Sequence, residues 1–408
     1  MKKIYCGLLA LMIFSSKKSF SQASANALDV LSWNIEWFGS ATNGPADLNL
    51  QEANVKKILR YIDADLMGFC EVVDTMRFRR VVDSLGSNYG FKISDYCSNN
   101  TTGTGNSWLT GQKLAFIYKK DMFSNLVIRG LGRNSPAGYT NWASGRFPYL
   151  LTADVTIAGV TKNMSFIMIH GKSGNTASDY QKRFNAATEL KDTLDTYFSN
   201  KIVLIIGDYN DALNHTISSG AGPESSYYPI VVDSTDSDHW KSITMPLANA
   251  GQTSMINFPN VIDNHIISNE CEPLFVPVSA WIRTDVTNVV PNYTTNNTSD
   301  HWPVFSQYFL NGFVASVPDV TASALGIKVF PNPFSSQICL QPTKSLTDVK
   351  LQLVDMNGRV VYKNYYRYLQ AGSRIEPAII TLKPGAYFIH LQTKNSQVVM
   401  KVIKTQIN

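Results

Sequence analysis

Residues 201–211 read KIVLIIGDYND, and this stretch decides the fold class. Residues 202–206 form a continuous apolar run, which is typical of a buried strand. Upstream, apolar side chains recur every three or four positions over residues 180–197 and predict an amphipathic helix. A helix that leads into a buried strand is the building unit of an α/β fold. Asp208 and Asn210 follow the strand, so they are expected at an edge of the sheet.

The same pattern continues from residue 27 to about residue 309. Residues 28–35 alternate at the period of a strand, and residues 66–70 form a buried strand. The apolar positions between Leu50 and Ile62 fit one face of a helix. Further strands are expected at residues 113–118, 150–157, 164–170, 261–267 and 303–309.

Residues 1–25 have the composition of a secretory signal peptide. Two lysines precede an apolar run at residues 4–14, which is too short to span a bilayer. Small residues follow, and cleavage is expected between Ser21 and Ala27. No later stretch approaches eighteen apolar residues, so no stable membrane span is expected. The protein is therefore expected to be secreted or to lie at the cell surface.

Composition and cysteine content fit a soluble exported protein. Hydrophobic residues make up 44% and charged residues 16%, which excludes a disordered chain. The net charge of +5 agrees mildly with an anionic partner. Four cysteines remain beyond the signal peptide, and their spacing matches no zinc motif. Cys97 and Cys271 are candidates for a disulfide, whereas Cys70 is expected to be a buried thiol.

Polar side chains follow or precede several of the expected strands at their ends. These are Asn34, Glu71, His170, Asp208, Asn210, Asp263, Asp300 and His301. Any one of them alone would more often be structural, so the inference rests on the set. Carboxylate and amide oxygens suit Mg²⁺ or Ca²⁺, and histidine moves protons near neutral pH. The set predicts a metal-assisted site for phosphate chemistry.

In their order along the chain these residues resemble the motifs of the endonuclease/exonuclease/phosphatase family, whose members are deoxyribonuclease-I-like metal-dependent phosphodiesterases. The matching pieces are Trp33-Asn34-Ile35, Cys70-Glu71-Val72, Gly145-Arg146-Phe147-Pro148, Ile169-His170, Gly207-Asp208-Tyr209-Asn210-Asp211, Ile262-Asp263 and Ser299-Asp300-His301-Trp302-Pro303-Val304. The resemblance implies an α/β domain at residues 26–310. Its fold would be a four-layer αββα sandwich, with two sheets packed face to face and helices outside.

The resemblance also implies which residues hold a metal ion. Glu71 would be the principal ligand, with Asn34, Asp300 and Asp208 near the ion. The ion would be Mg²⁺, with Ca²⁺ or Mn²⁺ as alternatives.

The remaining residues would carry catalysis and substrate binding. His301 would be the general base that activates water, oriented by Asp263. Asp208 and Asn210 would position that water and a phosphate or a second metal ion. The phosphate would be held by Arg146, Asn210 and His170.

One residue departs from the family pattern. Gln112 stands where the family often has Glu. A carboxylate would favour a charged His170, whereas an amide can only orient it. His170 is therefore expected in the site but not as a strong general acid. His265 follows Asp263-Asn264 and is expected to point away.

The string Ser-Asp-His-Trp occurs at residues 237–240 and again at 299–302. Only the second copy comes after Asp263 and runs into an apolar strand, so we assign Asp300 and His301 to the site. Asp238 and His239 of the first copy are expected in a loop that could approach the substrate.

After residue 310 the composition changes. Residues 311–326 form a linker of small residues, and residues 327–408 contain only strands separated by turns, which predicts a small all-β sandwich. This last segment resembles the C-terminal sorting domain of the type IX secretion system. The resemblance is carried by Val329-Phe330-Pro331-Asn332-Pro333-Phe334, the segment around Asn357-Gly358, Pro384-Gly385 and the closing residues 399–404. It implies export by that machinery; the alternative is a generic β accessory domain.

The combined expectation is a secreted, divalent-metal-dependent phosphodiesterase. It would be a monomeric endonuclease that cleaves extracellular nucleic acid, with Arg129, Arg133 and Lys172 as further phosphate contacts. One alternative is a phosphatase, or a phospholipase C that acts on sphingomyelin or inositol phosphates, because the fold does not choose among these substrates. Another is a surface binding protein without catalysis.

Overall fold

The computed structural model describes residues 26–232, 238–277, 279–312, 326–355, 360–377, 382–393 and 397–405. The expected signal peptide, Ser237 and all but the ends of the expected linker lie outside these residues. No helix among the described residues is both long and apolar enough to cross a membrane.

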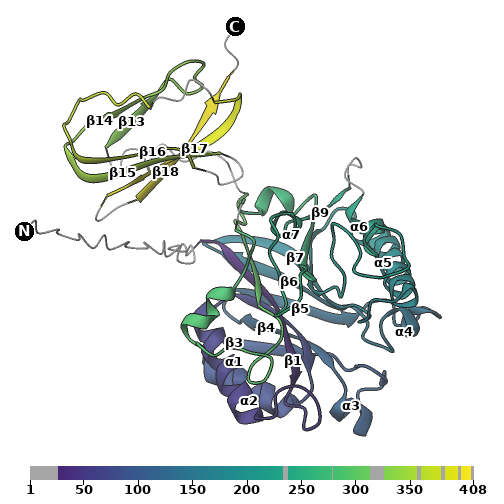
Figure 1. Cartoon of the computed structure of the whole chain (residues 1–408). Helices are drawn as coiled ribbons and strands as arrows, with labels where there is room; N and C mark the ends of the chain where they lie inside the picture. The colour runs from purple at the N-terminus through teal and green to yellow at the C-terminus, as the bar shows by residue number, and fades with distance from the viewer. Residues whose placement is uncertain are drawn as a thin grey trace, which may run out of the picture.

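Two six-stranded sheets build the larger part of the chain (Figure 1). The first has the order β11-β12-β1-β2-β4-β3, with β1 at Leu28–Phe38, β2 at Leu66–Val72, β3 at Tyr89–Ile93, β4 at Lys113–Lys119, β11 at Trp281–Ile282 and β12 at Val304–Tyr308. The second has the order β5-β6-β7-β8-β10-β9, with β5 at Phe123–Gly130, β6 at Tyr149–Ile157, β7 at Val160–His170, β8 at Ile202–Asp208, β9 at Trp240–Ser242 and β10 at Asp263–Ser268. In each sheet one central pair is parallel, β1 with β2 and β7 with β8.

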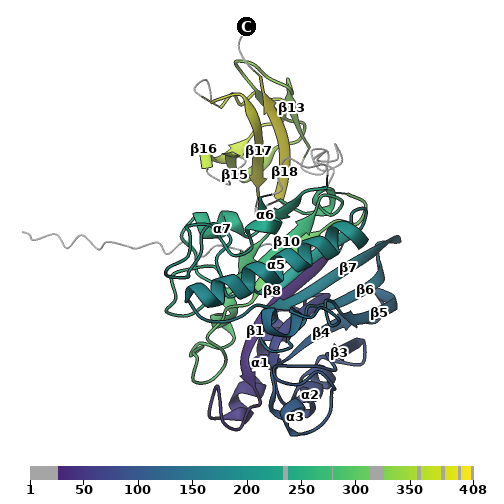
Figure 2. The ribbon, with the colours of Figure 1, turned by 90° about the vertical axis from the view of Figure 1, so that its right-hand side faces the viewer.

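Helices cover the outer face of each sheet. The long ones are α1 at Leu48–Ile62, α2 at Thr75–Leu85 and α5 at Ala177–Tyr197. Figure 2 shows α5 lying across the second sheet, while α1 and α2 pack on the first. Short helices are α3 at Asn106–Thr110, α4 at Gly138–Asn141, α6 at Tyr228–Val231 and α7 at Met245–Asn249, and 3₁₀ turns occur at Glu272–Leu274 and Thr284–Asn288.

The two sheets share one apolar core. Val30 of β1 belongs to the cluster between the sheets, whereas its neighbour Leu31 belongs to the cluster under α1 and α2. Gly68 in β2 lets the sheets approach, because a Cβ there would lie 2.6 Å from Met168 Sδ of the facing sheet. The layers are therefore helix, sheet, sheet and helix, which confirms the expected αββα sandwich.

The cysteine prediction is half right. Cys70 is buried as a free thiol, but the expected Cys97–Cys271 disulfide is wrong because both cysteines are free. Cys97 follows β3 and lies at one edge of the first sheet, near the start of β4. Cys271 follows β10 and lies at the opposite edge of the second sheet.

The C-terminal residues form a separate small β unit (Figure 1). A two-stranded sheet of β13 at Ile327–Phe330 and β14 at Cys339–Pro342 accompanies a four-stranded sheet in the order β16-β15-β17-β18. The four strands are β15 at Leu346–Asp355, β16 at Val360–Leu369, β17 at Gly385–Gln392 and β18 at Gln397–Lys404. All pairings in this unit's two sheets are antiparallel, which confirms the expected small all-β domain.

Candidate active site

The pairing of the strands brings the expected site residues to one edge of both sheets. In the second sheet, His170 at the end of β7 is the register partner of Asp208 at the end of β8. Asp208 is in turn the partner of Asp263 at the start of β10. In the first sheet, Asn34 pairs with Cys70, directly before Glu71.

A cluster of buried polar groups joins the two sheets at this edge. Asn34 Nδ2 donates to Glu71 Oε1 at 3.3 Å and to Asp208 Oδ2 at 3.0 Å. His170 Nε2 lies 3.6 Å from the same two oxygens. Burial raises the pKa of Glu71 and raises that of Asp208 to about 6. Two carboxylates are thus held together where neither is well hydrated.

The backbone beside Glu71 has an unusual conformation. Glu71 has φ 64°, and Glu36 and Trp37 have φ 42° and 47°, values that L-residues rarely adopt. The register between β1 and β2 shifts here, and Trp37 N donates to Glu71 Oε2 at 2.8 Å. Strained backbone of this kind is common at functional sites. Here the irregular pairing lets the Glu71 carboxylate turn toward Asp208.

His301 is held rigidly beside this cluster. Its Nδ1 lies 2.7 Å from Asp263 Oδ2, which also accepts from Ser254 Oγ at 2.7 Å. Ser299 Oγ accepts from the His301 N–H, and the His301 carbonyl accepts from Tyr293 and Trp33. Both the ring and its backbone are therefore fixed.

The free edge of the His301 ring faces the carboxylates. Nε2 lies 3.9 Å from Asp208 Oδ2 and 3.7 Å from Asp300 Oδ1. Burial alone would lower the pKa of His301, but Asp263, Asp208 and Asp300 outweigh it and raise the pKa well above its usual value.

The charges of the site suit a divalent cation. Its carboxylates are Glu36, Glu71, Asp208, Asp263 and Asp300, and the cationic partners are Arg146 and His301. Oxygen-rich clusters of this kind favour Mg²⁺, Ca²⁺ or Mn²⁺. Ligand atoms of Asp208, Asp263 and His301 lie within 4.8 Å of one another and offer an alternative group. We favour Glu71, Asp208 and Asp300, because Asp263 Oδ2 is already bonded to His301 and Ser254.

Arg146 approaches the cluster from the second sheet. It is 7% exposed, and its guanidinium donates to Gln112 Oε1 and to Gly171 O at 2.8 Å. Arg146 Nε is buried and has no hydrogen-bond partner among the described residues. Burial lowers the pKa of Arg146, and the negative charges of Glu71 and Asp208 act in the opposite direction.

The expected contact between Gln112 and His170 is wrong. The Gln112 amide oxygen accepts from the Arg146 guanidinium instead. His170 Nδ1 is buried and lacks a hydrogen-bond partner among the described residues. Burial, and then the charges of Arg146 and His301, lower the pKa of His170 well below its usual value. A neutral His170 agrees with the expectation that it is no strong acid.

The Gly207–Asp211 motif divides into two roles. Asn210 has φ 50° and donates to Asp208 from its backbone N at 2.8 Å and its side chain at 3.1 Å. Asp211 turns away and accepts from Ser226, Thr216 and the Ile217 backbone. Its carboxylate lies 3.7 Å from Arg183 Nε, and both side chains are fully buried.

We expect Asp211→Ala to destabilise the protein by about 3–5 kcal/mol, because it leaves Arg183 buried without a counter-charge. Urea denaturation measures this loss. Exposed Asp192 on α5 is the matched control, and Asp192→Ala should change the free energy of unfolding by less than about 0.5 kcal/mol. Equal effects of the two substitutions would contradict the structural role of Asp211.

The described part of the first Ser-Asp-His-Trp copy, residues 238–240, lies at the end of the second sheet opposite to the site. Trp240 pairs with Ser268, at the end of β10 opposite to Asp263. His239 Nε2 lies 3.1 Å from Glu272 Oε2, and the His239 carbonyl accepts from Asn269 N. It therefore does not approach the substrate side of the sheets.

His265 points away from the site, as expected. Its ring lies between the sheets, within hydrogen-bonding distance of Ser32 Oγ at 2.9 Å and Ser306 Oγ at 2.8 Å. Burial lowers the pKa of His265 to about 3, so the ring is neutral.

Sequence reasoning missed three residues that support His301, namely Ser254, Tyr293 and Ser299. Ser299 is signalled by its place in the Ser-Asp-His-Trp string, but the other two lie in irregular loops with no pattern.

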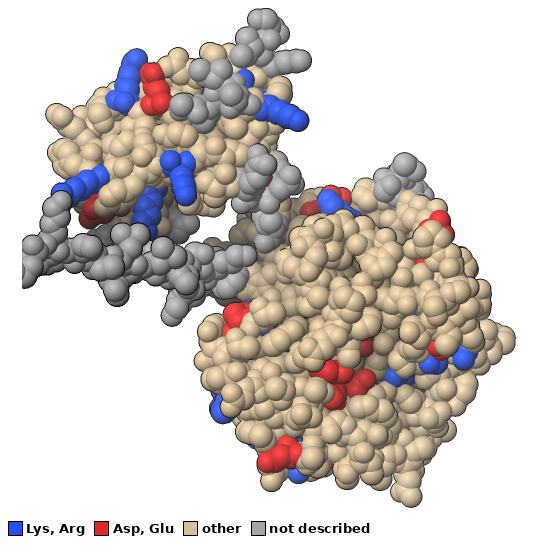
Figure 3. Space-filling view, in the orientation of Figure 1, with Lys and Arg blue, Asp and Glu red and all other residues tan. Residues whose placement is uncertain are grey.

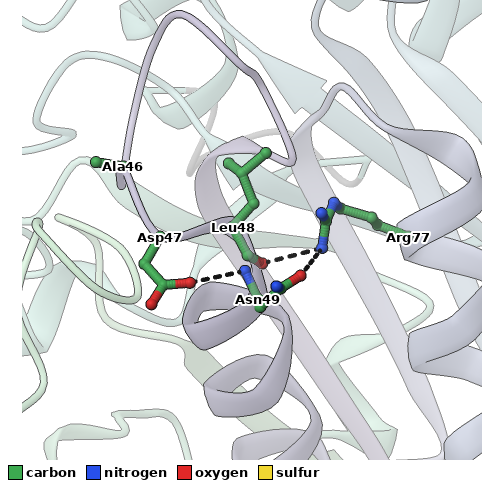
Figure 4. A pocket seen from close by; sticks show the side chains of 5 residues that line it. All are labelled: Ala46, Asp47, Leu48, Asn49 and Arg77. Carbon is green, nitrogen blue, oxygen red and sulfur yellow. Dashed lines mark hydrogen bonds between the residues drawn. The ribbon is translucent and has the colours of Figure 1, made fainter.

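An open groove beside the start of α1 is lined by Ala46, Asp47, Leu48, Asn49 and Arg77 (Figure 4). Its polar groups bond one another, with Arg77 Nη1 donating to Asn49 Oδ1 at 2.9 Å, so we assign it no role in catalysis.

Comparison with known families gives two matches. Residues 31–301 match the model of the Endonuclease/Exonuclease/phosphatase family, and residues 328–405 match the Secretion system C-terminal sorting domain. No curated protein sequence matches the chain.

Several solved structures are similar to the chain. An endonuclease/exonuclease/phosphatase protein from Bacteroides vulgatus shares 14% identity, with 69% of this chain and 98% of that chain covered and a TM-score of 0.48. The human Nocturnin catalytic domain with bound sulfate shares 12% identity, with 69% and 94% covered and a TM-score of 0.47. A mannosyl-6-phosphatase from Bacteroides thetaiotaomicron shares 13% identity, with 69% and 99% covered and a TM-score of 0.44.

Proposed function

Because the chain belongs to the endonuclease/exonuclease/phosphatase family, we propose that it hydrolyses phosphate esters with a divalent cation and a histidine-activated water. The observation that carries this proposal is the meeting of Glu71 and Asp208, from two different sheets, beside the Asp263–His301 pair. These are the groups required to hold a cation and to move a proton at one place.

His301 is the proposed general base. Its Nδ1 donates to Asp263, which fixes the tautomer and leaves Nε2 to accept the proton of water. The carboxylates that raise the pKa of His301 favour its charged form. A cation held by Asp208 and Asp300 would oppose that effect and would favour the neutral form of the ring that a base needs.

The phosphate lies, in this proposal, against Arg146, Asn210 and His170. Arg146 supplies charge through a guanidinium whose position is fixed by Gln112 and Gly171. His170 is neutral, so it contributes a hydrogen bond rather than a proton. A cation at Glu71, Asp208 and Asp300, with Asn34 beside it, would stabilise the negative charge that develops on the phosphate.

The sorting domain indicates the localisation of the protein. Its match indicates type IX secretion to the cell surface or to the outside, so the substrate is extracellular. An N-terminal signal peptide at residues 1–25 and a monomeric state remain part of the proposal.

The test is turnover by the purified full-length protein of phosphate monoesters, diesters, plasmid DNA, RNA and sphingomyelin. We expect at least one to be hydrolysed with Mg²⁺, Mn²⁺ or Ca²⁺, and EDTA to abolish the activity until the cation is restored. Activity that resists EDTA, or a folded protein without activity on any ester, would contradict the proposal.

A further inference from the structure

We propose that the substrate is a small phosphate ester whose remainder is uncharged and rich in hydroxyl groups, such as a phosphorylated sugar, rather than a nucleic acid. This inference rests on the proposed function. It comes from the loops that surround the site.

Five loops border the site, and none contains Lys or Arg. They are residues 39–47, 94–112, 209–227, 250–262 and 284–303, which together hold 80 residues. Each adjoins a strand end that carries or borders a site residue, as residues 39–47 follow β1 and residues 250–262 precede β10. Asn, Ser and Thr account for 34 of the 80. These side chains both donate and accept hydrogen bonds, as sugar hydroxyls require.

Two further cations, one in the loop before β6 and one in the loop after β7, already form ion pairs. Arg133 lies 3.1 Å from Asp95, and Lys172 lies 3.0 Å from Asp179. Arg146 is buried within the site itself. Figure 3 shows acidic side chains at the middle of this face, with uncharged surface around most of them and a few Lys or Arg side chains to their right. One buried guanidinium can meet one phosphate, but it offers no track for a chain of phosphates.

The positive charge of the protein lies elsewhere. Residues 26–310 contain 27 Asp and Glu against 21 Lys and Arg, whereas residues 327–408 contain 3 against 11. The mild agreement of the net charge with an anionic partner therefore belongs to the sorting domain, not to the catalytic domain. Nucleic-acid binding draws most of its affinity from cations that contact several phosphates, and the five loops around the site hold none.

The experiment compares kcat/KM of the full-length protein on sugar phosphates, plasmid DNA, RNA and sphingomyelin vesicles at 50 and 200 mM NaCl. We expect the sugar phosphates to be preferred by at least 100-fold, with less than threefold change between the two salt concentrations. A polymer held by several phosphate contacts would lose about 10³-fold or more over that range. Preferred turnover of nucleic acid or lipid would overturn the inference and leave the proposed function standing. No turnover of any ester would overturn both.

A second measurement tests whether the lack of cations in the loops excludes nucleic acid from the site. Asn257 and Asn296 are exposed beside the site, since Ile256 N donates to Asp300 O at 2.7 Å and Thr295 Oγ1 donates to Glu36 at 2.8 Å. In the double variant Asn257→Lys and Asn296→Lys, a short DNA duplex should inhibit sugar-phosphate hydrolysis at least tenfold more strongly than in the wild type. Asn200→Lys, which adds a cation before β8 at the opposite edge, should not change the inhibition. Equal inhibition of all three proteins would overturn the idea that missing cations exclude the polymer.

Discussion

Replacing His301 by Ala is expected to lower kcat/KM by about 10²–10⁴-fold, the usual contribution of a general base. The ring is the group whose Nε2 faces Asp208 and Asp300 while Asp263 holds its other nitrogen. Steady-state kinetics with saturating divalent cation measures the loss. The backbone contacts of His301 come from its N–H and carbonyl, so the variant keeps them and should fold.

The chain provides a matched control for this substitution. His239 occupies the same position in the other Ser-Asp-His-Trp copy, but it pairs with Glu272 at the opposite edge of the second sheet. His239→Ala should change kcat/KM less than about twofold, because a partly exposed ion pair contributes little. Similar losses from both substitutions would show that the base has been assigned to the wrong histidine.

The strand ends explain why so much of the site could be predicted. Glu71, His170 and Asp208 stand at or near the ends of apolar strands, and Asp263 begins an antiparallel one, so all four lie at one edge of the α/β sandwich. The copy at residue 299 was separable from the copy at residue 237 because only it continues into a buried strand, β12. The periodicity of residues 180–197 likewise predicted α5.

Contacts between loops could not be predicted in the same way. Gln112 and Arg146 come from different sheets, so nothing in the sequence indicated that their side chains bond. Ser254 reaches Asp263 through an irregular loop without periodicity. The charge of the whole chain likewise hides its distribution, because it combines an acidic segment at residues 26–310 with a basic segment at residues 327–408. Both cases concern placement rather than residue type.

The isosteric change Glu71→Gln is expected to lower kcat/KM by at least about 10²-fold, since a cation at such a site contributes several kcal/mol to the transition state. The amide keeps the size of the side chain and one carbonyl oxygen to accept from Trp37 N, so the local backbone should persist. What it loses is the negative charge that completes the oxygen cluster with Asp208.

Thermal unfolding separates this loss from a loss of fold. Burial raises the pKa of Glu71 above its unfolded value, so ionising this carboxylate costs folding free energy that accumulates as pH rises from the unfolded pKa and is complete above the folded pKa. In EDTA, Glu71→Gln should therefore have a Tm at least as high as the wild type. Divalent cation should raise the Tm of the wild type, and of Glu272→Gln at the opposite edge, but not that of Glu71→Gln. A full cation-induced shift in Glu71→Gln would place the metal ion elsewhere, and the alternative group of Asp208, Asp263 and His301 would then hold it.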